Sequence, residues 1–223
     1  MKTLLALAAL LAAGPALAEQ IDAQALSRLP RADVVVLGEM HDNPVHHSNQ
    51  ARAVAALAPA ALVFEMLTPE QAAKVTPALR ADRAALEEAL GWADTGWPDF
   101  AMYHPIMTAS DAAIYGAALP RDEVRRAVGE GAAEVFGEQA AAYGLADALP
   151  GDQQQEREDL QREAHCNALP ETLLAGMVEA QRLRDAGFAR AVVKAVAETG
   201  GPVAVITGNG HARRDWGLPA ALA

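Results

Sequence analysis

Histidine and glutamate follow three short apolar runs of this sequence, and these residue types suit acid–base or metal chemistry. The residues concerned are Glu39 and His41, Glu65, and His211. The apolar runs predict strands, buried on both faces, over residues 32–37, 60–64 and 203–206. In an open α/β sheet, ligands bind at the carboxyl ends of the strands, where these side chains would converge. They could form an acid–base pair or hold a Mn, Co or Zn ion; alternatively, each only completes the hydrogen bonding of a strand end.

A long helix predicted over residues 171–198 gives an independent signal. One of its faces is apolar at both ends and polar in the middle, the residues being Leu174, Met177, Gln181, Arg184 and Phe188. A buried guanidinium needs a carboxylate partner, so we expect Arg184 to reach Glu39 or Glu65. There it could steady a carboxylate or an oxyanion. The alternative is that Arg184 extends past the apolar face to solvent.

An aromatic segment, residues 91–105, holds two of the three tryptophans and the first tyrosine of a chain that is only 4% aromatic. Such a segment could line a flat apolar pocket, with Trp97 in its wall. A tyrosinate or an imidazole can ligate haem iron, which makes Tyr103 and His104 candidate ligands. The alternative is a local hydrophobic cluster that pins an insertion.

A helix is predicted directly after the first strand, because Asn43 is a good N-cap and Pro44 suits the first helical position. The helix should cover residues 44–57. His46 and His47 lie in its first turn and could contact the propionates of a haem. Of the two, we expect His46 to face the site, and His47 is more simply explained as a solvated residue.

The composition restricts the partners and the compartment. A chain of 223 residues can form one domain with a sizeable core, and a formal net charge of −11 argues against binding nucleic acid. Residues 1–18 have one lysine, an apolar run and a small-residue cleavage site, which predicts a secretory signal peptide followed by a single domain over 19–223. The only cysteine, Cys166, allows no intramolecular disulfide and lies far from the cleavage site, which argues against a lipid anchor and favours a bacterial periplasm.

The order of the predicted elements indicates an α/β fold with a mostly parallel sheet flanked by helices. The first two strands and the helix between them should form a right-handed βαβ unit. Largely helical insertions are predicted at about 68–110 and 121–170. Within and beside them, a helix should begin at Pro105 and a short strand should occupy the second half of residues 112–119.

Several of these segments, in this order, resemble the ChaN-like haem-binding uptake family of the wider Tiki, TraB and erythromycin-esterase superfamily. The matching segments are residues 38–47, 64–66, 96–98 with Tyr103, 165–166, Gln181 with 184–185, and 207–212. The Glu-Met-His-Asp-Asn-Pro run and the Gly-Asn-Gly-His turn are specific, whereas the other pieces alone would be weak. The resemblance covers most of residues 30–219.

The resemblance implies a periplasmic protein of haem and iron uptake, with haem between the protomers of a homodimer and envelope haem-uptake components as partners. It implies a tyrosine ligand to the iron, which maps onto Tyr103. The superfamily's hydrolytic members use residues that map onto Glu39, His41, Glu65 and His211, so a metal-dependent hydrolase is the alternative. Relatives continue into a further strand, which leaves open whether this chain is truncated at its C-terminus.

Overall fold

A computed structural model describes residues 20–222, so the predicted signal peptide lies outside the described residues. Four strands form a parallel sheet: Val34–Glu39 (β1), Ala61–Phe64 (β2), Ala113–Gly116 (β3) and Val203–Gly208 (β4). Their order in the sheet is β1-β4-β2-β3. The last strand therefore lies between the first two, which are parallel as predicted but not neighbours.

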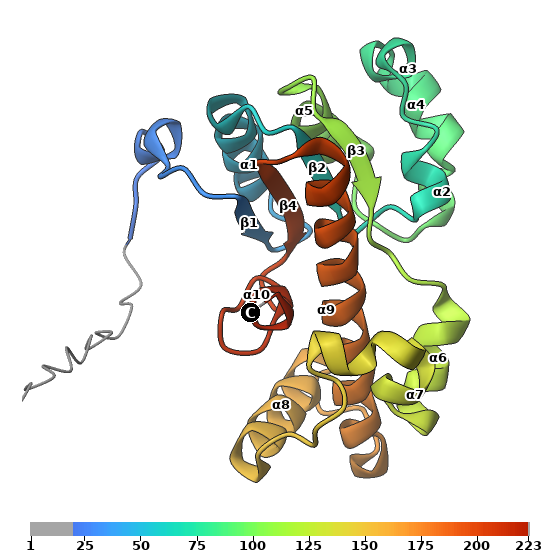
Figure 1. Cartoon of the computed structure of the whole chain (residues 1–223). Coiled ribbons are helices and arrows are strands. Elements are labelled where there is room, and N and C mark those ends of the chain that lie inside the picture. The colour runs from blue at the N-terminus through green and yellow to red at the C-terminus, as the bar shows by residue number, and fades with distance from the viewer. Residues whose placement is uncertain (1–19, 223) are drawn as a thin grey trace, which may run out of the picture.

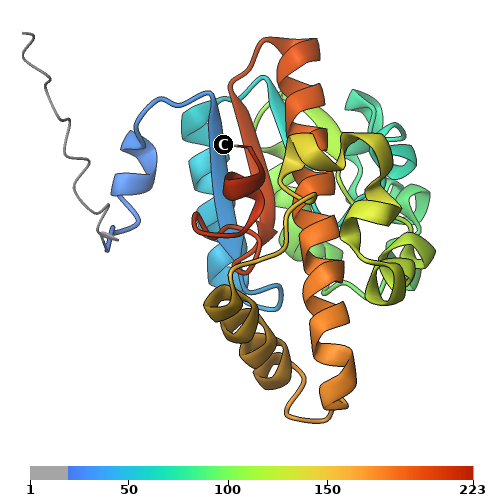
Figure 2. The same ribbon diagram turned by 60° about the horizontal axis from the view of Figure 1, so that its bottom comes forward.

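The helices lie on both faces of the sheet and beyond its carboxyl edge (Figures 1 and 2). The α-helices are Pro44–Leu57 (α1), Pro69–Ala72 (α2), Pro77–Ala81 (α3), Arg83–Leu90 (α4), Phe100–Thr108 (α5), Arg121–Glu130 (α6), Ala132–Phe136 (α7), Gly151–Ala164 (α8), Glu171–Thr199 (α9) and Leu218–Ala221 (α10). The 3-10 helices are Ala25–Arg28 (η1), Trp92–Asp94 (η2) and Gly137–Tyr143 (η3). The α/β class predicted from the sequence is confirmed, and helices fill most of both predicted insertions. No helix of the described chain is long and apolar enough to cross a bilayer.

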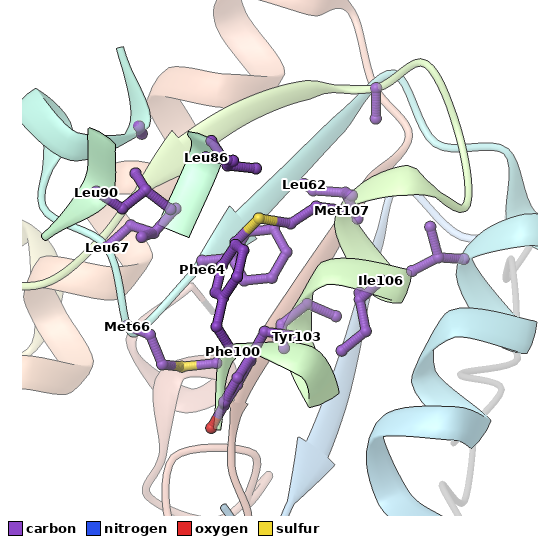
Figure 3. Close-up of a cluster of buried hydrophobic side chains, with 14 of the residues drawn as sticks. Leu62, Phe64, Met66, Leu67, Leu86, Leu90, Phe100, Tyr103, Ile106 and Met107 are labelled. Carbon is purple, nitrogen blue, oxygen red and sulfur yellow. The ribbon is translucent and has the colours of Figure 1, made fainter. Parts of the chain in front are cut away.

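Each central strand is buried on both faces, which explains its unbroken apolar sequence. In β2, Leu62 and Phe64 point into a cluster formed with α1, α4 and α5 (Figure 3), while Val63 points to the opposite face. Successive strand side chains alternate between faces, so a strand covered on both sides needs apolar residues throughout. The second face is covered by the C-terminal half of α9, through Phe188 and Val192.

Helix α9 links the sheet to the helical insertion. Its C-terminal half packs on the sheet, and its N-terminal half extends past the carboxyl edge, where α6, α7 and α8 gather around it (Figure 1). Gly176 allows the close contact between α9 and α6, because a Cβ at this position would lie 2.2 Å from the Val128 carbonyl oxygen. The insertion thus overhangs the edge at which the strand-end residues lie.

The structure corrects two predicted boundaries. Helix α5 begins at Phe100, not at Pro105, because the Asp99 side chain caps it by accepting a hydrogen bond from the Ala101 amide. The proline within it removes one backbone hydrogen bond, a loss outweighed by burying the helix's apolar face. The third strand occupies the first half of residues 112–119, because it pairs with the four residues of β2 and ends where that ladder ends.

The predicted start of α1 is confirmed. The Asn43 side chain accepts a hydrogen bond from the Val45 amide, and Pro44 is the first helical residue. The capping residue satisfies a backbone donor that would otherwise lack a partner at the start of a helix. This sharp change from strand to helix places the intervening residues at the carboxyl edge of the sheet.

Candidate functional site

A cavity of about 1030 Å³ lies at the carboxyl edge of the sheet, beneath the helical insertion. The five predicted catalytic residues all line it, namely Glu39, His41, Glu65, Arg184 and His211. They come from β1, the turn after β2, α9 and the turn after β4. The parallel sheet brings them together because its strands all end at this edge.

Glu39 is the centre of a buried hydrogen-bond network and is 1% exposed. Its Oε1 accepts from the Tyr103 hydroxyl at 3.0 Å and from His41 Nδ1 at 2.8 Å. The buried Nδ1 of His47 lies 3.4 Å from Glu39 Oε2, so a second imidazole faces the same carboxylate. A single glutamate therefore holds two aromatic side chains by hydrogen bonds, Tyr103 of α5 and His41 of the turn after β1, and faces His47 of α1 without one.

His41 lines the cavity, and its other nitrogen, Nε2, lies beside Gly208. A Cβ built on Gly208 would lie 2.9 Å from His41 Nε2 and 3.7 Å from Glu65 Oε2, so the glycine leaves room for the imidazole beside this carboxylate. Burial alone would lower the pKa of His41, but the bond to Glu39 and the charges of Glu65 and Glu39 outweigh it and raise that pKa. Trp97 contacts the His41 ring edge to face, with 4.8 Å between ring centroids.

His211 is held in the same way by Asp185, a residue that sequence reasoning did not select as a site residue. His211 Nδ1 donates to Asp185 Oδ1 at 2.7 Å, and its Nε2 lies 3.7 Å from Glu65 Oε1. Glu65 Oε2 accepts from the Thr207 hydroxyl at 2.6 Å and the Gly208 amide at 2.7 Å. Two histidines, each bonded to its own carboxylate, thus flank a third carboxylate.

The pKa of His211 is raised: burial opposes its charged form, but the bond to Asp185 and the charges of Asp185 and Glu65 outweigh burial. A raised pKa stabilises the fold fully below the unfolded value near 6.5, and this contribution is lost as pH rises through the folded pKa. We therefore expect the stability gap between the wild type and His211→Gln to shrink as pH rises above about 6.5. Urea unfolding of both proteins across that range measures the gap, and a constant gap would contradict the assignment.

Arg184 lies in the cavity wall but does not form the expected ion pair. Its Nη1 donates to Gln181 Oε1 at 3.0 Å, and neither Glu39 nor Glu65 forms a salt bridge with it in the described structure. It remains within electrostatic range of Glu65, whose charge favours the guanidinium cation. Arg184 is therefore a cation that is not committed to a carboxylate and faces the cavity.

The remaining wall combines apolar side chains with uncharged polar ones, the carboxylate of Asp94 and a group of arginines. The apolar side chains are Met66, Trp97, Leu119, Val124, Val128, Met177 and Phe188. Arg121 and Arg125 of α6 add two guanidinium groups to that of Arg184. The cavity therefore combines a broad apolar surface with separate imidazole and arginine groups, the chemistry of a site for an apolar, anionic ligand.

The structure places the four other predicted haem contacts outside the lining of this cavity. Tyr103 is fully buried, its ring lies in the hydrophobic cluster of Figure 3, and its hydroxyl donates to Glu39. Burial and the charge of Glu39 raise the pKa of this tyrosine well above its usual value. His104 is bonded to the Arg80 carbonyl oxygen at 2.8 Å. Ligation of iron by Tyr103 therefore remains a prediction that requires its hydroxyl to leave Glu39.

The two histidines of α1 do not lie as predicted, since His46 was expected to face the site and His47 to be solvated. His47 is 1% exposed and donates from Nε2 to the His41 carbonyl oxygen at 2.8 Å. His46 is turned away from the cavity, and its Nδ1 accepts from the Met40 amide at 2.9 Å. His47 is buried because it lies on the same face of α1 as Gln50 and Val54, and this face packs against the core.

Among residues 20–222, no group of three or more histidine, cysteine, aspartate or glutamate side chains is arranged to hold a metal ion. His41 and His211 are already bonded through Nδ1, and Glu65 is bonded to the β4 turn. The described arrangement therefore fits paired acid–base groups better than a preformed metal site. Asp185 could have been found in the sequence as a carboxylate that shares a helix face with the apolar residues Val178, Ala189 and Val192.

Comparison with known proteins was made against families, curated proteins and solved structures. Residues 25–222 match the family described as haem-binding uptake, Tiki superfamily, ChaN. The solved structure described as "Cofacial heme binding to ChaN of Campylobacter jejuni" is similar, with a TM-score of 0.63 and 23% identity, covering 89% of this chain and 77% of that one. No curated protein matches. Because the family match extends over nearly the whole described chain, this protein belongs to the ChaN family of haem-binding uptake proteins in the Tiki superfamily.

Proposed function

We propose that this protein is an exported haem-binding protein of haem and iron uptake, and that it holds haem in the cavity at the sheet edge. The observation that carries the proposal is the cavity itself, in a chain of the haem-binding uptake family. Its volume of about 1030 Å³ is at the upper end of ligand pockets. Export is supported by the sequence of residues 1–18 alone.

The residues present fit a haem. The apolar side chains of β2's turn, α6 and α9 would contact the macrocycle, and Arg121, Arg125 and Arg184 would pair with the propionates. When bound, haem would supply an iron centre whose reactivity depends on its axial ligand and on the polarity around it. The protein's contribution is to exclude water from one side, to orient the ring and to offer that ligand.

His41 is the group best placed to meet the iron. Its Nδ1 donates to Glu39, which fixes the ring and leaves Nε2 as the free nitrogen at the cavity wall. The resemblance to the family predicts Tyr103 instead. In the described conformation its hydroxyl is buried against Glu39, so we propose that Tyr103 positions Glu39 and thereby His41.

A haemin titration of the protein without residues 1–18, followed by Soret absorbance, tests the proposal. We expect saturable binding that weakens at least about tenfold in His41→Ala and by a smaller factor in Tyr103→Phe, which removes a partner of Glu39 but leaves the imidazole in place. His165→Ala is the matched control, because this exposed histidine of the α8 end is bonded only to the Gln161 carbonyl oxygen. Loss of binding in Tyr103→Phe alone would transfer the ligand role to the tyrosine. Weak, non-saturating binding to the wild type would refute the haem proposal.

Haem between two protomers of a homodimer is also proposed from the resemblance, as is delivery to envelope haem-uptake components. Two exposed apolar side chains, one directly after β1 and one at the start of α1, support a covering partner: Met40 is 57% exposed and Val45 is 62% exposed. Light scattering during the haemin titration measures the assembly. A dimer that forms on haemin addition and is weakened by Val45→Glu supports this part, whereas a haem-bound monomer contradicts it.

A second candidate function is hydrolysis, favoured by the two histidine–carboxylate pairs that flank Glu65. His211 with Asp185 could act as a general acid or base, and Arg184 could stabilise an oxyanion. Ester and peptide substrates, with and without added Mn, Co or Zn, test this candidate and its metal dependence. Turnover that is lost in His211→Gln would establish it, and turnover unaffected by this change would exclude the site as its source.

A further inference from the structure

A second cavity, of about 500 Å³, lies on the other side of His211 from the first. It is formed by α8, the middle of α9 and the segment after β4. The two cavities are adjacent, because both are lined by Gln181, Asn209, Gly210 and His211. Nothing in the haem proposal uses this second space.

The second cavity contains a buried arginine whose charge has no ion-pair partner among the described residues. Arg157 of α8 is 8% exposed. Its Nη2 makes only two long contacts, 3.4 Å to Gln153 Oε1 and 3.3 Å to the Trp216 carbonyl oxygen. Its buried Nε has no hydrogen-bond partner. Burial disfavours its charge, and the carboxylates of Asp185 and Asp215 act on it only from beyond ion-pair distance, so this guanidinium has unused capacity to bind an anion.

Two other arginines of this region differ in this respect. Arg162, one helical turn further along α8, pairs with Asp159 and with Glu171, the latter at 2.7 Å. Arg213 pairs with Asp215 at 2.5 Å. Of these three arginines, only the buried Arg157 lacks an ion-pair partner.

The rest of the wall is aromatic and aliphatic. The guanidinium groups of Arg157 and Arg213 lie 5.2 Å and 3.6 Å from the centroid of the Trp216 ring, and Leu160, Ala164 and Val178 complete the apolar lining. Asp185 also lines the cavity, but its Oδ1 accepts a hydrogen bond from His211. The cavity therefore offers a cation at one end of a space suited to a flat apolar body.

We propose that this second cavity binds an organic carboxylate with an aromatic or apolar body. The carboxylate accepts hydrogen bonds from Nε and Nη2 of Arg157, and the body lies against Trp216 and Leu160. A free carboxylic acid would supply such a carboxylate, and so would the propionate of a haem bound in the adjacent cavity. The inference goes beyond the haem proposal and stands without it.

Isothermal titration with 2-naphthoate, and with neutral 2-naphthalenemethanol, tests the site in the wild-type protein. We expect naphthoate to bind saturably and the alcohol to bind at least about tenfold more weakly, since it lacks the charged acceptor. Arg157→Gln should weaken naphthoate at least about tenfold and remove the preference over the alcohol. Arg162→Gln is the matched control on the same helix and should leave both affinities unchanged. Thermal unfolding of each variant shows that it is folded.

A second variant and a second ligand keep the result unambiguous. Trp216→Leu should weaken both naphthalene ligands together, because it removes the surface that contacts the ring. Competition between naphthoate and haemin distinguishes the two sources of the carboxylate. If the two compete, and Arg157→Gln lowers the affinity for haemin but not for haemin dimethyl ester, the site binds a haem propionate. If the two bind independently, the site binds a free carboxylic acid. Equal naphthoate affinity in the wild type and Arg157→Gln, or no binding to the wild type, would overturn the inference.

Discussion

Replacing Glu39 with alanine is expected to lower the free energy of unfolding by about 3 kcal/mol or more. The change removes the acceptor for the Tyr103 hydroxyl and for His41 Nδ1, and it leaves His47 Nδ1 without the carboxylate that it faces. Tyr103 and His47 are buried, so water cannot replace the lost partner without opening the core. Urea unfolding monitored by circular dichroism measures the loss.

The matched comparison is Glu39→Gln, which keeps the size of the side chain and an oxygen that can accept from Tyr103. It should cost less than the alanine variant, because only the charge and one acceptor oxygen are lost. Ala93, an exposed residue of η2, gives a surface control when changed to serine, with an expected effect within about 0.5 kcal/mol. If Glu39→Ala were as stable as the wild type, the carboxylate would not organise the three aromatic side chains.

Gly176→Ala is expected to destabilise the protein by about 2 kcal/mol, although alanine favours helices over glycine by about 1 kcal/mol. The new Cβ would lie 2.2 Å from the Val128 carbonyl oxygen, so α6 would have to move away from α9. Val128 and Met177 both line the large cavity, and the displacement should therefore also weaken haemin binding. Urea unfolding and the Soret titration measure the two effects.

Gly129→Ala provides the control in the facing helix. Its Cβ would meet no atom within 4 Å, so the change should leave stability unchanged or raise it by up to about 1 kcal/mol. A stabilised Gly176→Ala protein with unaltered haemin affinity would show that close contact between α6 and α9 does not shape the cavity.

The strand-end residues could be predicted from sequence because two strong local signals agree there. Short apolar runs define the strands, and the cap at Asn43 with Pro44 fixes where α1 begins. The parallel arrangement then brings Glu39, Glu65 and His211 to one edge without knowledge of the strand order. That order, with β4 between β1 and β2, depends on long-range pairing that no local pattern encodes.

The orientation of single side chains was harder to predict. His46 and His47 differ by about 100° around the helix axis, so their roles depend on how α1 docks on the sheet. Tyr103 lies on a helix that begins five residues before the predicted start, and this turns its ring into the core. Arg157 could not be recognised, because its burial depends on α8 and the segment after β4, which are far apart in sequence.

In the proposed mode of binding, haem lies in the cavity at the sheet edge, with His41 next to the iron. The most direct measurement is the position of the iron in an anomalous difference map from crystals of the haemin complex. We expect a peak inside the cavity, next to Nε2 of His41 and on the side of Trp97. A peak outside the cavity, or one bonded to Tyr103 instead of His41, would contradict this mode of binding.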